Sequence, residues 1–192
     1  MTAPADAARA IAGSLEPQPA LDRPDLLAEP VADALRALPA DVAAGCLVAA
    51  IDPELADTAA FCEAYGSPLE ASANCVVVAG SRSGQRRHAA CVVLATTRAD
   101  VNTVVRRRLD VRKASFASME EAVELTGMAY GGITPFGVPA GWPVLVDAAV
   151  PATPAVVVGS GLRGSKLLVP GAVLEALPAA EVLEGLGTPT RP

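Results

Sequence analysis

Two valine-rich runs separated by a short polar segment constrain the fold more than any other feature of this chain. Residues 75–79 and 89–95 are apolar, and the segment 80–85 between them is rich in glycine and serine. Turn-forming residues between two β-branched runs predict a hairpin. With the strand and helix patterns on either side, this hairpin favours a mixed α/β domain with one sheet and no repeats.

The other elements follow from apolar periodicity and from end signals. Asp57 or Thr58 can cap a helix that Gly66 ends, and Ser118 forms a capping box with Glu121. We expect strands at residues 47–51, 144–146, 156–158 and 166–169, and helices at residues 30–38, 57–65, 101–109, 118–126 and 170–177.

Composition bounds the domain organisation. The chain of 192 residues is long enough for one domain, and with only 3% aromatic residues its core must consist of Ala, Val and Leu. Residues 1–28 are rich in Ala and Pro and are expected to form a mobile or loosely packed extension before a domain at 29–187 and a tail at 188–192. No apolar run reaches membrane-spanning length and no secretory signal is visible, so we expect a cytoplasmic protein without a membrane partner.

Cysteine and histidine usage argues against a metal site. Cys46, Cys62, Cys75 and Cys91 form no Cys-x-x-Cys pair, and His88 is the only histidine. We therefore expect buried structural cysteines and neither a metal nor another cofactor. His88 is expected to be a solvated residue at a strand edge rather than a general base, because no partner is evident.

The charge is unevenly distributed although its net value is −6. Residues 82–113 hold nine Arg and Lys against only Asp100 and Asp110. This pattern suits a locally positive face for phosphate contacts, and a solubilising surface explains it equally well.

The segment Gly131–Gly137 lies between a helical pattern and the strand at 144–146. Three glycines and Pro135 favour a tight, exposed loop whose free N–H groups can hold a carbonyl oxygen or an oxyanion. A plain turn is the alternative.

Residues 126–137, Thr-Gly-Met-Ala-Tyr-Gly-Gly-Ile-Thr-Pro-Phe-Gly, resemble the Gly-x-x-x-Pro loop of the YbaK/prolyl-tRNA synthetase-associated domain family. Residues 57–66, 73–78 and 156–164 resemble that family's first helix, first long core strand, and late strand with its glycine turn. The resemblance covers residues 30–187 in the right order. It implies a YbaK-like single domain with a mostly antiparallel or mixed central sheet surrounded by helices.

The same resemblance implies a free-standing aminoacyl-tRNA deacylase that clears a mischarged tRNA, such as Cys- or Ala-tRNA(Pro). The expected partner is the 3′ end of aminoacyl-tRNA, with prolyl-tRNA synthetase as a second candidate and no DNA. The resemblance further implies that no serine or cysteine nucleophile triad is used and that the substrate's own terminal ribose hydroxyl assists. By analogy, amides near Gly131 and Gly132 hold the aminoacyl carbonyl. The remaining loop residues are expected to contact the substrate: Ile133, Thr134, Pro135, Phe136 and Gly137.

Two positions depart from the family pattern. Asn74 stands where many active members carry a lysine, in Asn-Cys-Val against Lys-Thr-Leu. Asparagine keeps two donors but lacks the charge, which Arg82 or Lys166 could supply instead. Lys166 itself stands where some relatives have an aspartate. A binding module without catalysis is therefore the alternative to a deacylase, and a small-molecule binder or hydrolase without an RNA partner is a third reading.

Four further residues are candidate substrate contacts with a structural alternative. Thr58 and Asp147 can equally cap a helix or a turn, and Gly159 and Ser160 can equally form a hairpin turn.

Overall fold

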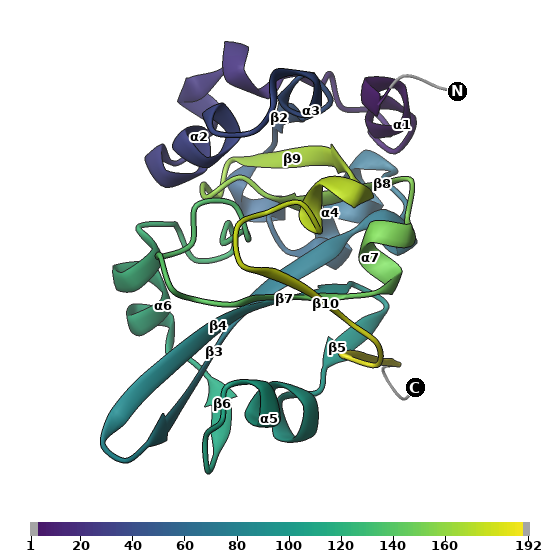
Figure 1. Cartoon of the computed structure of the whole chain (residues 1–192). Coiled ribbons are helices and arrows are strands. Elements are labelled where there is room, and N and C mark those ends of the chain that lie inside the picture. The colour runs from purple at the N-terminus through teal and green to yellow at the C-terminus, as the bar shows by residue number, and fades with distance from the viewer. Residues whose placement is uncertain (1–3, 190–192) are drawn as a thin grey trace.

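Two main β-sheets organise the chain in the computed structural model, which describes residues 4–189 (Figure 1). The first has the strand order β1 (Gln18–Pro19), β2 (Leu47–Ala50), β9 (Ser165–Pro170) and β8 (Ala155–Gly159). The second has the order β10 (Ala180–Leu183), β7 (Val144–Asp147), β4 (Gln85–Leu94), β3 (Ala73–Arg82) and β6 (Ala114–Phe116). Strands β5 (Thr97–Ala99) and β11 (Gly187–Pro189) pair separately.

The prediction of a single sheet is therefore wrong, whereas the mixed α/β class is confirmed. Strand β7 runs parallel to β4 and β10, and the other pairs within the main sheets are antiparallel. The central strands of both sheets are buried on both faces, so their sequences are similar apolar runs. Such runs carry no signal that assigns a strand to one sheet or the other.

Helices connect the strands of the two sheets. They are α1 (Pro4–Ala10), α2 (Glu29–Arg36), α3 (Ala40–Ala43), α4 (Thr58–Tyr65), α5 (Arg106–Arg108), α6 (Met119–Thr126) and α7 (Ala149–Ala152). A π-helical turn at Val101–Val105 precedes α5, and the helix expected at 170–177 is only a 3-10 turn at Gly171–Leu174. Within residues 4–189, none of these helices has the length and apolar character needed to span a bilayer.

The expected hairpin is present and longer than its apolar runs. Strands β3 and β4 pair from Ala73 with Leu94 to Arg82 with Gln85. Ser83 and Gly84, both with positive φ, make the two-residue turn that joins them. Figure 1 shows this hairpin projecting to the lower left, away from the first sheet.

The helix-end signals are confirmed, although the capping box is only half formed, because the Glu121 carboxylate bonds to Arg86 and His88 instead of the Ser118 N–H. The Asp57 carboxylate accepts a hydrogen bond from the Ala59 N–H (3.1 Å), and Gly66 ends α4 with φ +68°. The Ser118 hydroxyl accepts from the Glu121 N–H, and Gly127 ends α6 with φ +66°. These local rules fix the start of α4.

The main core lies between the two sheets, and a smaller core lies on the outer face of each sheet. Along each strand, side chains alternate between the main core and the outer core of their own sheet. The main core includes Val48, Val92, Val146, Val156 and Leu167. The outer core of the first sheet includes Ala8, Leu47, Phe61, Val157 and Leu168, so α1 and α4 cover that face. The outer core of the second sheet includes Cys91 and Leu145, together with Val105 and Leu109 from the segment around α5.

The expected loose extension is wrong for residues 4–28. Ala8 is fully buried, β1 pairs with β2, and the Ser165 hydroxyl donates to the Leu26 carbonyl (2.7 Å). The small alanine side chains of α1 allow it to pack closely on the sheet, although they give almost no periodic signal. Thr188 and Pro189 of the expected tail pair with β5, and residues 1–3 and 190–192 lie outside the described residues.

Candidate active site

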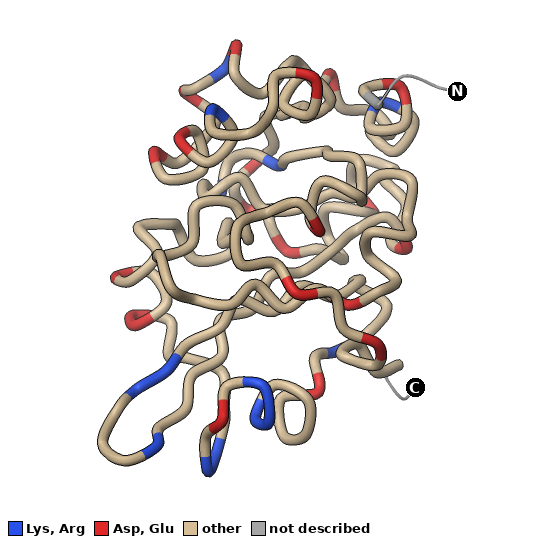
Figure 2. The backbone as a smooth tube through the Cα atoms, viewed as in Figure 1, with Lys and Arg blue, Asp and Glu red and all other residues tan. Residues whose placement is uncertain are grey.

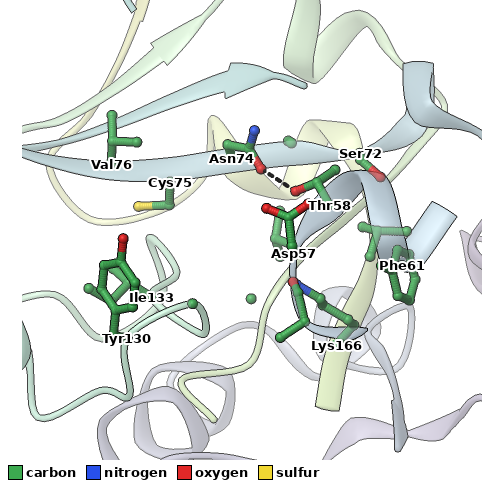
Figure 3. A pocket seen from close by; sticks show the side chains of 16 residues that line it. Asp57, Thr58, Phe61, Ser72, Asn74, Cys75, Val76, Tyr130, Ile133 and Lys166 are labelled. Atoms are coloured by element: carbon green, nitrogen blue, oxygen red, sulfur yellow. Dashed lines mark hydrogen bonds between the residues drawn. The ribbon is translucent and has the colours of Figure 1, made fainter. Parts of the chain in front are cut away.

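A cavity of about 360 Å³ opens where α4 begins, β3 begins, β8 ends and the glycine loop passes (Figure 3). Its walls come from segments that are far apart in the sequence. They are Ala56, Asp57, Thr58, Phe61, Ser72, Ala73, Asn74, Cys75, Val76, Tyr130, Gly131, Ile133, Val157, Val158, Gly159 and Lys166.

Asn74 and Thr58 form one side of this pocket. The Thr58 hydroxyl donates to Asn74 Oδ1 at 2.8 Å. This bond fixes the amide so that Nδ2, with two donors, has no protein partner among the described residues. The capping role belongs to Asp57, so Thr58 is left to orient Asn74.

The pocket wall contains one anion, Asp57, and one cation, Lys166. Lys166 is buried on β9, and its Nζ donates to the Ala56 carbonyl at 2.8 Å. Burial lowers the pKa of Lys166, and the charge of Asp57 partly opposes that shift. Figure 3 shows the amine end of Lys166 turned toward the residues that begin α4. Lys166 is therefore the candidate cation that lies in the same pocket wall as Asn74.

Arg82, the other candidate cation, is not part of the pocket. It lies at the tip of the hairpin, where it pairs with Asp110. Asn74 is eight residues away along β3, which corresponds to roughly 26 Å at the rise of a strand. Strand length therefore excludes Arg82 from any contact with a group bound beside Asn74.

The two glycines of the predicted oxyanion site differ. Gly131 lines the pocket with φ +83°, and its N–H has no protein partner within residues 4–189. The Gly132 N–H donates to the Ala129 carbonyl (2.9 Å), and its own carbonyl accepts from the Gly161 N–H (2.8 Å). Gly132 is thus committed to holding the loop, and only the Gly131 amide remains for a ligand.

Only Ile133 of the following loop residues reaches the pocket. Thr134 and Phe136 are fully buried, and Phe136 belongs to the main core. Pro135 and Gly137 border a separate apolar cavity of about 220 Å³ beside α2. The chain turns inward after Ile133, so the expectation that these four residues contact substrate does not hold.

Of the three remaining candidate residues, one lines the pocket and two have structural roles. Gly159 lines the pocket, whereas Ser160 is buried and bonded to the Ser165 hydroxyl at 2.7 Å. The Asp147 carboxylate accepts from the N–H groups of Ala149 (3.1 Å) and Gly187 (2.6 Å). Asp147 therefore has the capping role that was its alternative.

Sequence reasoning missed several wall residues, among them Cys75 and Tyr130. Tyr130 is 59% exposed and directly precedes Gly131, so its position beside the loop was the available signal. Burial, and secondarily the nearby Cys91, raise the pKa of Cys75. Its thiol therefore stays protonated and is not an activated nucleophile.

His88 is bonded and mostly buried, contrary to the expected solvated residue. Its Nε2 lies 2.8 Å from a Glu121 carboxylate oxygen, and its ring stacks on Trp142 at a centroid distance of 4.8 Å. Glu121 is 33 residues away in sequence, so no local pattern could reveal the pair. The only histidine of the chain thus lies outside the pocket wall.

This cluster predicts a pH-dependent stability. Hydrogen bonds from Arg86 and then His88 lower the pKa of Glu121 to about 2, from an ordinary value of 4.5. A carboxyl with a lowered folded pKa stabilises the fold above pH 4.5, and this contribution disappears as pH falls from 4.5 to about 2. We expect Glu121→Gln to lower the free energy of unfolding by about 1–2 kcal/mol at pH 7.

Urea unfolding at pH 7 and at acid pH would measure this effect, with Glu120→Gln on the same helix as the control. Glu120 is exposed and has no ion pair among the described residues. The difference between Glu121→Gln and the unmodified protein should shrink below pH 4.5. Equal stability of the two at pH 7 would contradict the assignment.

Solved structures of other proteins share this fold. The chain superposes on a candidate trans-editing enzyme for prolyl tRNA synthetase with a TM-score of 0.67 and 23% identity, over 82% of this chain and 94% of that one. It also superposes on a scaffold protein from work on epitope backbone grafting, with a TM-score of 0.66 and 21% identity, over 82% and 95%. At these identities the likeness shows a shared fold. No curated protein sequence matches the chain.

The amino-acid sequence identifies the protein family. Residues 52–177 match the aminoacyl-tRNA editing domain, so the chain belongs to that family. The resemblance drawn from the glycine loop and its flanking segments is confirmed. The matched residues include the start of α4, β3, the glycine loop and β9, and therefore all the walls of the pocket.

Proposed function

We propose that the protein is a free-standing deacylase that hydrolyses the ester of a mischarged aminoacyl-tRNA, with Cys- and Ala-tRNA(Pro) as the first candidate substrates. Membership of the editing-domain family supports the reaction class. The structural neighbour described as a candidate trans-editing enzyme for prolyl tRNA synthetase motivates the choice of tRNA.

The observation that carries this proposal is the presence of one carboxylate, Asp57, and one amine, Lys166, in the same pocket wall as Asn74. An aminoacyl ester has a protonated α-amino group close to a carbonyl and to ribose oxygens. A carboxylate suits the amino group, and an ammonium with a free amide suits the oxygens. The pocket therefore offers complementary charge to both ends of the same short group.

Hydrolysis in this pocket would proceed by direct attack of water. Cys75 has a raised pKa, and the only histidine lies elsewhere, so no residue pair supports a covalent intermediate. An activated ester needs chiefly positioning and stabilisation of the oxyanion. The Gly131 amide and the Lys166 ammonium are the donors that would meet the developing charge.

Selectivity would come from the apolar part of the wall, which Ile133, Val157 and Val158 form. Such a surface discriminates weakly, because one methylene is worth about 1–3 kcal/mol. A small side chain would fit, and the enzyme would depend on binding its tRNA to act only on the right substrate.

A binding module without turnover is the second candidate, and Asn74 is the observation that favours it. The usual strand lysine is absent, and the amide is tied to Thr58. Such a module would bind the 3′ end of tRNA and release no amino acid.

A panel of aminoacyl-tRNAs, including Ala- and Cys-tRNA(Pro), tests the proposal when incubated with the purified protein and with Gly131→Val. We expect release of one amino acid and its loss in the variant. A β-branched residue is strained at φ +83°, so the loop must move, while the nearest atom to a new Cβ is the end of the Arg163 side chain (2.7 Å), which can shift. The fold should thus survive. Unchanged turnover in Gly131→Val would refute the assignment of the loop.

A further inference from the structure

Positive charge is concentrated at the end of the molecule opposite the N-terminal helices. Figure 2 shows it around the hairpin tip, α5 and the segment that leads to β6. We define this basic end by Arg82, Arg86, Arg87, Arg98, Arg106, Arg107, Arg108, Arg112 and Lys113. It holds nine of the 15 Lys and Arg of the chain, whereas the whole protein has a net charge of −6. The rest of the molecule is therefore strongly acidic.

Acidic partners neutralise only part of this charge. Asp110 pairs with Arg82 and Arg87, Glu121 pairs with Arg86, and Glu181 pairs with Arg108. Four exposed cations have no such partner within the described part of the chain: Arg98, Arg107, Arg112 and Lys113. They leave a surplus that a partner of opposite charge can use.

The basic end is also hollowed. A cavity of about 360 Å³ is lined by Arg86, Arg87 and Arg108, with Trp142 and Pro143 on its other side. The His88 ring, held by Glu121, stacks on Trp142 and supports that side. These three arginines are ion-paired, so the hollow contributes a concave shape of positive potential, and the unpaired cations contribute the surplus charge.

The basic end and the pocket lie at opposite ends of β3. Asn74 lines the pocket and Arg82 marks the hairpin tip, roughly 26 Å apart at the rise of a strand. The pocket volume of about 360 Å³ can hold only the end of a tRNA. The helical stem that follows this end must therefore lie outside, and it carries closely spaced phosphates.

We infer that the basic end binds the phosphate backbone of the tRNA stem while the aminoacylated 3′ end occupies the pocket. The choice of RNA rests on the proposed function, and the composition of the surface supports it. Eight of the nine cations are arginines, whose planar forks bind phosphate in a bidentate manner. Proteins recognise double-stranded RNA chiefly through its shape, phosphates and 2′-hydroxyls. An acidic protein surface is the competing occupant.

Binding of uncharged tRNA at several salt concentrations tests this inference. The variant Arg107→Gln with Arg112→Gln removes two unpaired charges of the basic end. The control, Arg23→Gln with Arg36→Gln, removes two surface arginines near the N-terminal helices and changes the net charge equally. We expect the first variant to bind roughly tenfold more weakly at low salt, with a salt slope shallower by about two, and the control to bind like the unmodified protein.

Each other result overturns the inference. It is overturned if the unmodified protein does not bind uncharged tRNA, if the first variant binds as tightly as before, or if both double variants weaken binding equally. It is equally overturned if the first variant loses affinity for prolyl-tRNA synthetase and keeps its affinity for tRNA. Uncharged tRNA carries no ester, so its binding is measured independently of hydrolysis. If the basic end binds tRNA and the aminoacyl-tRNA panel releases no amino acid, this inference is supported and only the proposed deacylase activity is contradicted.

Discussion

Replacing Lys166 with methionine is expected to slow deacylation about 100-fold or more, which is the usual loss when one preorganised oxyanion donor is removed. Lys166 is the only cation in the pocket wall. Asn74 and the Gly131 amide can still donate hydrogen bonds, but neither carries a charge. The variant should therefore deacylate slowly although its fold is unchanged.

The same variant should be at least as stable as the unmodified protein at pH 7. Burial lowers the pKa of Lys166 from its ordinary value of 10.5, so its charged form is destabilising in the folded state. The stability of the unmodified protein accordingly rises as pH increases through the folded pKa toward 10.5. Methionine has a similar length and no charge to desolvate. Any advantage of Lys166→Met in melting temperature should shrink in alkaline buffer.

Single-turnover deacylation and thermal melting would measure both effects, with Arg36→Met as the control. Arg36 is exposed on α2 and is not part of the pocket wall. The control should retain its rate. A Lys166→Met protein with unimpaired turnover would remove Lys166 from the mechanism and leave Asn74 as the principal donor.

Local rules predicted the parts of the site that local sequence determines. The caps at Asp57 and Gly66 place α4, and the hairpin places Asn74 near the start of β3. Lys166 was visible as a lone charge in the otherwise apolar strand Ser165–Pro170. Its burial against the start of α4 was not visible, because Nζ bonds to Ala56, 110 residues earlier in the chain.

Contacts between distant segments explain the failed predictions. Arg82 and Asn74 belong to the same strand, and only the full length of β3 shows that they are too far apart to share a ligand. The sequence of the glycine loop predicts one continuous site. In the structure, Thr134 and Phe136 are buried in the protein and do not reach the pocket. His88 finds its carboxylate on α6, which only the assembled sheet brings near.

Replacing Gly159 with alanine is expected to destabilise the fold by about 2 kcal/mol or more, within the range for overpacking a well-packed site. A Cβ at this position would lie 2.2 Å from the Gly132 carbonyl oxygen and 2.6 Å from that of Ile133. Both atoms are backbone, so no side chain can rotate away. The end of β8 and the glycine loop would have to separate.

That separation would also affect the pocket, because Gly159, Gly131 and Ile133 all line it. The hydrogen bond from the Gly161 N–H to the Gly132 carbonyl (2.8 Å) would be strained first. We therefore expect deacylation to fall with the melting temperature in Gly159→Ala. In Gly131→Val, by contrast, deacylation should fall with little change in melting.

Gly164→Ala is the matched control on the same turn. Its φ is not positive, and its new Cβ would come no closer than 3.5 Å to the Pro53 ring, an ordinary contact. Thermal melting of the two variants should differ by several degrees, since about 1 kcal/mol shifts the melting temperature of a domain of this size by roughly 2–4 °C. Equal melting temperatures for Gly159→Ala and Gly164→Ala would show that β8 does not approach the glycine loop this closely. The placement of Gly159 beside Gly131 in the pocket wall would then be wrong.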